Sequence, residues 1–176
     1  GILGSTARYA YLTCEQRKRV ATLAKQHAGD IPVMVGVIGR IDAILHLADD
    51  AQAAGANVLL LPAVSYQSLR DDEVFSRFEA VTRHLSVPVC ISDNPGTTHF
   101  TFTDELHGRL SSLKGVSSVM FPDELQLAKG IIDTLAQLPL VLIVKRPWEW
   151  MWYEAPGKKV KGIAAEDAVF TDHFIW

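Results

Sequence analysis

Short apolar runs alternate with helix-like segments over most of this sequence, and this alternation restricts the fold more than any other feature. Each run is largely β-branched or leucine-rich and nearly all apolar, as is typical of strands buried on both faces of a parallel sheet. The runs occupy 31–37 (IPVMVGV), 56–62 (ANVLLLP), 87–91 (VPVCI), 115–120 (GVSSVM) and 138–144 (LPLVLIV). Helical periodicity between them, at 13–29, 42–55, 71–85, 103–113 and 122–138, predicts an α/β fold with right-handed crossovers.

Capping signals mark several of the predicted helix ends. Thr13 followed by Gln16 forms a capping-box pattern, and Thr103 suits the N-cap of a later helix. Gly55 suits the position just past a helix C-terminus. Ile2 and Leu3 are interpreted as the end of a further strand, so we expect the N-terminus to be cut or missing.

Two architectures fit this order of elements. Parallel strands joined by helices form either an open, doubly wound sheet or a closed (β/α)₈ barrel. The strand-to-strand repeat of roughly 28 residues is compatible with both. Periodicity alone therefore leaves the choice open.

Charge and cysteine content restrict the partners and the compartment. The formal charge of −3 gives no basic field for nucleic acid or an anionic membrane surface. No apolar run reaches the ~18 residues of a membrane span, and the opening GILGSTARYAY has no signal-peptide pattern. Two cysteines give no disulfide framework, so we expect a cytoplasmic protein without nucleic-acid or membrane partners.

The last 31 residues depart from the repeating pattern. Residues 146–176 contain all four tryptophans, and the alternation WEWMWY within them favours a strand with an aromatic face. Three interpretations remain open: an aromatic segment packed over the flank of the sheet, an oligomer contact, or a stacking platform for bases or sugars. We therefore divide the chain into a repeating domain at 1–145 and an aromatic-rich tail at 146–176.

Four stretches in register resemble the dihydrodipicolinate synthase / N-acetylneuraminate lyase family. They are GSTARYAYLTCEQRKRV (4–20), IPVMVGVIGRIDAILHLADDAQAAGANVLLLPAVSY (31–66), VPVCISDNPGTTHFTFTDEL (87–106) and LKGVSSVMFPD (113–123). The resemblance implies a class I aldolase-type TIM barrel, in which a lysine forms a Schiff base with pyruvate or a related 2-oxo acid. It also implies no cofactor and no metal, and no His, Cys or Asp spacing in the sequence suggests a metal site.

The resemblance assigns roles to several residues of this chain. Gly4, Ser5 and Thr6 match the segment that holds the carboxylate of the 2-oxo acid. Tyr66 matches a tyrosine of a proton relay, and Asn94 and Thr97 lie on the substrate loop that follows the strand at 87–91. From the residues themselves, Asp93 and Asn94 before Pro95 also favour an Asx-Pro turn, with His99 on the surface.

Two further positions depart from the family pattern at the groups that do the chemistry. The second relay tyrosine falls on Ser92, whose hydroxyl is on a shorter side chain and is a weaker acid than a phenol. The Schiff-base lysine falls on Met120, whose thioether cannot form an imine. Lys145, at the end of the strand at 138–144, is a speculative surrogate, although a solvated lysine at a strand exit is the simpler interpretation.

The length of the chain limits the barrel that it can form. A complete (β/α)₈ barrel takes ~250 residues, and this chain has 176. We therefore expect a partial TIM barrel comprising the second to seventh β/α units. It is either a fragment or rearranged product of a longer gene, or a homo-oligomer in which the aromatic tail and a partner chain cover the open edges.

The functional expectation follows from the family and from its departures. By resemblance the chain is a 2-oxo acid lyase or aldolase, a carbon–carbon or carbon–oxygen lyase, whose Schiff-base chemistry is lost. The alternative is a non-catalytic protein, either a small-carboxylate binder or an oligomeric scaffold.

Overall fold

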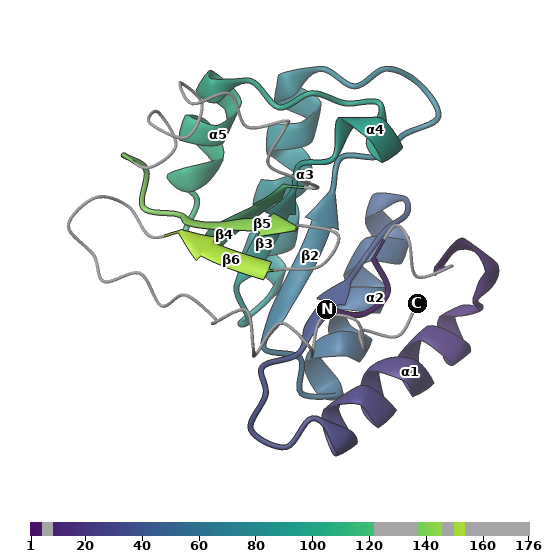
Figure 1. Ribbon diagram of the computed structural model, residues 1–176. Coiled ribbons are helices and arrows are strands. Elements are labelled where there is room, and N and C mark those ends of the chain that lie inside the picture. Colours follow the sequence, from purple (N-terminus) through teal and green to yellow (C-terminus); the bar gives the residue numbers. More distant parts are fainter. Residues whose placement is uncertain (5–8, 122–136, 146–149, 154–176) are drawn as a thin grey trace.

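The computed structural model describes residues 1–4, 9–121, 137–145 and 150–153. In these residues the chain forms one sheet in the order β1-β2-β3-β4-β5-β6, so that each strand pairs with its neighbours in sequence (Figure 1). The strands are β1 (Met34–Gly36), β2 (Val58–Pro62), β3 (Val89–Ser92), β4 (Val116–Phe121), β5 (Val141–Lys145) and β6 (Trp150–Tyr153). The first five are parallel, whereas β6 runs antiparallel to β5.

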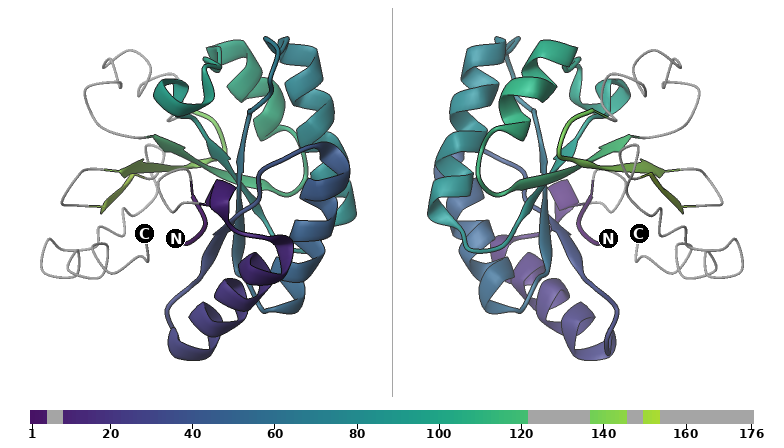
Figure 2. Two further views of the ribbon diagram at one scale, coloured as in Figure 1. Left: turned by 90° about the vertical axis from the view of Figure 1, so that its right-hand side faces the viewer. Right: turned by 90° about the vertical axis from the view of Figure 1, so that its left-hand side faces the viewer.

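Helices connect the first four parallel strands and cover one face of the sheet (Figure 2). They are α1 (Cys14–His27), α2 (Ile41–Ala53), α3 (Asp71–His84) and α5 (Asp104–Ser111), with the short η1 (Tyr9–Tyr11) and α4 (Pro95–Thr98) at loops. This right-handed alternation of parallel strands and helices is the arrangement of a (β/α) barrel.

The apolar residues of the strands divide between the two faces of the sheet. Leu59, Leu61 and Ile91 belong to the large core that the helices close, together with residues such as Phe78 and Leu110. The opposite face carries a second cluster, in which Leu60 and Cys90 are buried and the partly buried Met34, Val58 and Met120 pack against them. Burial on both faces explains why the strands read as continuous apolar runs.

The N-terminal residues extend the sheet beyond β1. Ile2 bridges Val35 in parallel register, and the Ile2 amide donates to the Met34 carbonyl at 2.8 Å. The Gly36 amide in turn donates to the Ile2 carbonyl at 2.9 Å. The interpretation of Ile2 and Leu3 as the end of a strand is therefore confirmed.

The helix boundaries agree closely with the capping signals. Thr13 and Gln16 form both bonds of the capping box, and the Thr103 hydroxyl accepts from the Leu106 amide at 3.1 Å. Gly55 has φ +90°, in the left-handed region that favours glycine after a helix. The predicted helix at 122–138 lies almost wholly outside the described residues, as does the tail beyond residue 153.

The strand boundaries predicted from the sequence differ by a few residues from those in the structure, at most of the strand ends. The run at 31–37 is in strand conformation only over Met34–Gly36. The tryptophan-rich alternation does form a strand, β6, but an antiparallel one. Within the part of the chain that the structure describes, no helix combines the length and the hydropathy needed to cross a membrane.

Candidate functional site

A small cavity lies where β2 and β3 end. Its volume is about 30 Å³, which is room for one or two water molecules. The lining combines apolar side chains with hydroxyl groups, and comprises Gly4, Tyr9, Ile38, Leu60, Pro62, Val64, Ser92, Thr97 and Thr98. Pro62 and Ser92 are the last residues of their strands, so the cavity occupies the carboxyl end of the sheet, where α/β barrels have their sites.

The loop after β3 brings two threonines to this cavity. Pro95 is the first residue of α4, and the turn ends at His99, which has φ +56° and is exposed. The Thr98 hydroxyl donates to the Asn94 carbonyl at 3.0 Å and is buried. The Thr97 hydroxyl is 3.3 Å from the same carbonyl. Asn94 thus acts through its backbone, because its side chain makes no capping bond, and it is not among the residues that line the cavity.

The loop after β2 brings Val64 to the cavity. An Arg77 Nη1 proton is donated to the Val64 carbonyl at 2.8 Å, which ties this loop to α3. Burial lowers the pKa of the Arg77 guanidinium, and the nearby Glu73 carboxylate acts in the opposite direction. Tyr66, two residues further on, is fully exposed at 104% and does not line the cavity.

Ser92 and Met120 lie side by side at the ends of β3 and β4. They are Cα partners in the parallel ladder, and Met120 pairs on its other side with Ile143. Ser92 lines the cavity, whereas Met120 packs against the Leu60 and Cys90 cluster. Burial raises the pKa of the Cys90 thiol to about 12, so this thiol stays protonated at neutral pH.

The remaining predicted residues are only partly described. Gly4 lines the cavity, but Ser5 and Thr6 lie outside the described residues. Lys145 is the last residue of β5 and pairs through its backbone with Trp150. The described structure therefore brings together Gly4, Ser92 and Thr97, and adds Val64 and Thr98, which were not among the predicted site residues.

A buried acid–base pair lies directly behind Ser92. The Asp93 Oδ2 is 3.3 Å from the His107 Nε2, and the two side chains are 10% and 2% exposed. The sequence suggested an Asx-Pro turn for Asp93, and the structure corrects this because the carboxylate is buried against α5. The position of His107 in its helix could have indicated that its side chain is buried, because it lies on the buried face of α5 with Leu106 and Leu110.

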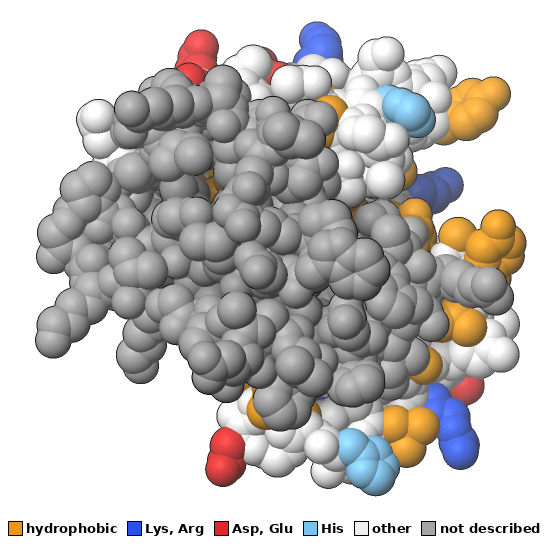
Figure 3. All heavy atoms as spheres, viewed as in Figure 1, with side chains coloured by type: hydrophobic (Ala, Val, Ile, Leu, Met, Phe, Trp, Pro, Cys, Tyr) orange, Lys and Arg blue, Asp and Glu red, His pale blue; other side chains and the backbone are white. Residues whose placement is uncertain are grey.

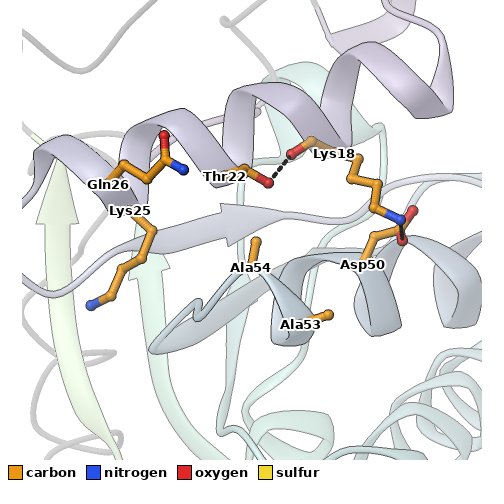
Figure 4. Close-up of a pocket in the computed structure, with 7 residues that line it drawn as sticks. All are labelled: Lys18, Thr22, Lys25, Gln26, Asp50, Ala53 and Ala54. Carbon is orange, nitrogen blue, oxygen red and sulfur yellow. Dashed lines mark hydrogen bonds and ion pairs between the residues drawn. The ribbon is translucent and has the colours of Figure 1, made fainter.

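A larger groove of about 290 Å³ lies between α1 and α2 (Figure 4). Lys18 bonds to Asp50 at 2.9 Å across it, and Asp50 raises the pKa of Lys18. Lys25 bonds to Asn57 at 3.2 Å. Both lysines therefore already have partners, and the residues that line the groove belong to α1, α2 and the residue after α2, not to the carboxyl ends of the strands. Among the described residues, no cluster of His, Cys, Asp and Glu could hold a metal.

The described surface carries charges of both signs. On the face shown in Figure 3, Lys and Arg side chains lie near Asp and Glu side chains at the upper and lower rims. This mixture of signs among the described residues fits the small net charge of the chain.

Comparison with known proteins finds relatives that include several 4-hydroxy-tetrahydrodipicolinate synthases. No family model matches the chain. It is 29% identical over 119 residues to the 4-hydroxy-tetrahydrodipicolinate synthase of Hyphomonas neptunium, covering 66% of this chain and 41% of that protein. It is 30% identical over 111 residues to the same enzyme of Brucella abortus, covering 61% and 38%.

Solved structures with a similar fold include the same enzyme. The crystal structure of dihydrodipicolinate synthase from Agrobacterium tumefaciens superimposes with a TM-score of 0.75 and 37% identity, covering 82% of this chain and 50% of that one. The chain thus spans half or less of the length of these relatives, which agrees with a partial (β/α)₈ barrel. The sequence and the fold together confirm the resemblance of this chain to part of the proteins of the dihydrodipicolinate synthase family.

Proposed function

We propose that this chain binds a small 2-oxo acid at the cavity between β2 and β3 but does not form a Schiff base with it. The observation that carries the proposal is the pairing of Ser92 with Met120 at the strand ends. By resemblance, these are the positions of a tyrosine and of the reactive lysine. Neither residue present can supply the chemistry of the family at that position.

The loss concerns the reaction pathway itself. Imine formation needs a neutral amine, and a thioether has no nitrogen. A serine hydroxyl is both shorter and far less acidic than a phenol, so it cannot replace a tyrosine in proton transfer. Removing a covalent nucleophile abolishes the covalent route rather than slowing it by a modest factor.

Binding is supported by the lining of the cavity. The Ser92 hydroxyl can donate to a carboxylate or carbonyl oxygen. The Thr97 and Thr98 hydroxyls can do so only by giving up the bonds that they donate to the Asn94 carbonyl. The side chains of Leu60 and Val64 offer an apolar wall for a methyl group. Because the cavity holds only water-sized molecules, a three-carbon acid requires the loops to move. We therefore expect weak binding, with a Kd of roughly 1 mM.

Pyruvate is a suitable probe because two proteins of the same fold were solved with it. They are YagE, a prophage protein of the family from Escherichia coli K12, and the dihydrodipicolinate synthase of Acinetobacter baumannii. Their identities to this chain are 21% and 19%, so they support the fold, and pyruvate is only the first acid to test.

Calorimetric titration with pyruvate tests the binding part of the proposal. We expect Ser92→Ala and Thr97→Val to weaken binding by roughly tenfold each, since each loses a hydrogen bond to a charged ligand. Thr22→Val is the matched control, because Thr22 lines the groove between α1 and α2 instead. Equal affinity in the wild type and both cavity variants would contradict the proposed site.

A second proposal, self-association, is supported by Tyr66. A tyrosine side chain that is fully exposed on a loop beside the cavity is available to a partner, and aromatic residues are enriched in protein interfaces. Light scattering should therefore give a mass above 19.4 kDa, and Tyr66→Ser should lower it. A monomer at micromolar concentration would contradict this proposal without affecting the first.

A further inference from the structure

Asp93 and His107 connect the end of β3 to α5 inside the protein. Asp93 follows Ser92, and its amide donates to the Met120 carbonyl at 2.9 Å, which continues the β3–β4 ladder. The imidazole of His107 packs between two aromatic rings, with centroid distances of 5.3 Å to Phe102 and 6.1 Å to Phe121. Two titratable groups thus meet in apolar surroundings, where an unbalanced charge is costly.

The hydrogen bonds of His107 determine which nitrogen faces the carboxylate. Its Nδ1 is 3.1 Å from the Thr103 carbonyl oxygen, which can only accept, so Nδ1 carries a proton. In the neutral imidazole, Nε2 then carries no proton, and its lone pair faces the Asp93 carboxylate. The distance from Nε2 to the Asp93 Oδ2 is 3.3 Å. Nε2 is fully buried and has no hydrogen-bond partner among the described residues, although its distance to Asp93 is within ion-pair range.

We propose that Asp93 and His107 share one additional proton, held on Nε2, and that this buried ion pair positions the loop from Asp93 to Phe100 over the cavity. The proton converts a lone pair opposed to a carboxylate into a charge-assisted contact. It resides on nitrogen because imidazole is the stronger base, by about 2.6 pKa units for the free side chains. Asp93 and His107 are therefore positioning residues and do not touch a ligand.

The loop depends on the pair because each of its two ends is fixed by a separate contact. Asp93 holds the start of the loop to α5 through His107. Phe100 holds the other end through its edge-to-face contact with Phe102, at a centroid distance of 5.0 Å. Between these anchors lie Thr97 and Thr98, which line the cavity. A change at Asp93 should therefore be transmitted to the threonines without a change of core volume.

Other charged groups on the packed helices have partners of their own. Asp71 accepts from the Thr103 hydroxyl at 3.0 Å, and Arg109 bonds to Asp72 at 2.8 Å. Both contacts join α3 to α5 near the surface, whereas Asp93 faces His107 in the interior. Asp72→Asn is therefore a suitable control. It removes the carboxylate that pairs with Arg109 of α5 and leaves the contact between Asp93 and His107 unchanged.

Nitrogen-15 NMR of the histidine rings tests the shared proton without any ligand. At pH 7.5 a free histidine is mostly neutral, since its pKa is about 6.5. We expect both ring nitrogens of His107 to carry protons at this pH. His84, whose Nε2 faces the exposed Asp49 at 2.7 Å, is an internal reference in the same spectrum. An unprotonated Nε2 on His107 at pH 7.5 would overturn the proposal.

Two substitutions separate proton sharing from simple packing. In Asp93→Asn the amide can donate to a neutral Nε2, so we expect the Nε2 proton signal to be lost while the loop keeps its place. In Asp93→Ala Nε2 is left without a partner, and the amides of residues 97–100 should exchange with solvent about tenfold faster. Asp72→Asn should alter neither readout.

The outcomes decide the proposal even if the alanine variant does not fold. Retention of the Nε2 proton in Asp93→Asn would contradict sharing with the carboxylate. Unchanged exchange in a folded Asp93→Ala would contradict the positioning role. Neither readout involves pyruvate, so this inference stands or fails independently of the proposed function.

Discussion

The Leu3 carbonyl oxygen lies where a side chain on Gly36 would be. A Cβ built on Gly36 would be 2.1 Å from that oxygen, far inside van der Waals contact with backbone atoms that cannot rotate away. Leu3 itself has φ +56°, so this approach is made with a backbone conformation unusual for leucine. The glycine therefore allows the N-terminal segment, which carries Gly4 to the cavity, to lie against β1.

Gly36→Ala should detach this segment. We expect a loss of roughly 1–3 kcal/mol in the free energy of unfolding, together with weaker pyruvate binding, because Gly4 leaves the cavity. Urea denaturation followed by calorimetry measures both. Gly108→Ala is the control: a Cβ there has no neighbour within 4 Å, and alanine favours a helix by roughly 1 kcal/mol. Equal stability of the two variants would contradict the account.

Arg77 should hold the loop after β2 in place. Removing its bond to the Val64 carbonyl in Arg77→Met should lower the free energy of unfolding by roughly 1.5–3 kcal/mol, as for other bonds from charged donors. Arg83→Met on the same helix breaks only the exposed pair with Glu79 and should cost under about 1 kcal/mol. A similar cost for both substitutions, measured by urea denaturation, would mean that the Val64 contact contributes nothing specific.

Cys90 should make stability fall at alkaline pH. Burial raises its folded-state pKa from 9.0 to about 12, so above pH 9 the unfolded chain releases a proton that the folded chain retains. The free energy of unfolding should therefore be at its full value below pH 9 and fall by up to about 1.4 kcal/mol per pH unit up to 12. The difference between wild type and Cys90→Val, measured against pH, isolates this contribution from other titrating groups.

The two thiols should also differ in reactivity. Cys14 is exposed at the start of α1, whereas Cys90 is buried. At pH 8, a thiol reagent should modify Cys14 in the folded protein and reach Cys90 only after denaturation. Rapid modification of Cys90 in folded Cys14→Ser would show that the inner face of the sheet is open to solvent.

The sequence was most informative where structure depends on neighbours along the chain. Thr13, Thr103 and Gly55 act within one turn of their own helices, so their roles could be predicted from local patterns. The strands could be predicted because burial on both faces makes each of them a continuous apolar run. The antiparallel direction of β6 depends on the turn that precedes it, and periodicity contains no information about direction.

The site was harder to predict because it depends on contacts between distant segments. Ser92 and Met120 were aligned through the resemblance, and their pairing in the ladder supports that register. The exposure of Tyr66 depends on the course of a loop, and its proposed role in proton transfer remains a prediction. The Asp93–His107 contact joins a strand end to a helix, and neither residue type specifies the other as its partner.

The main alternative to the proposed loss of Schiff-base chemistry is that Lys145 forms the imine instead. It ends β5, at the same edge of the sheet as Ser92 and Met120. A lysine at the carboxyl end of a barrel strand could form an imine if its amine were neutral. Lys145→Arg keeps the charge but removes this amine, and Met120→Lys introduces an amine at the family's position. These two variants provide the negative and positive controls for a trapping experiment.

Borohydride reduction in the presence of pyruvate, followed by peptide mass spectrometry, shows whether any lysine of this chain forms a Schiff base. We predict no pyruvyl adduct on any lysine of the wild-type chain, and an adduct on residue 120 in Met120→Lys. An adduct on Lys145 of the wild type, absent from Lys145→Arg, would contradict the claim that this chain has lost Schiff-base chemistry.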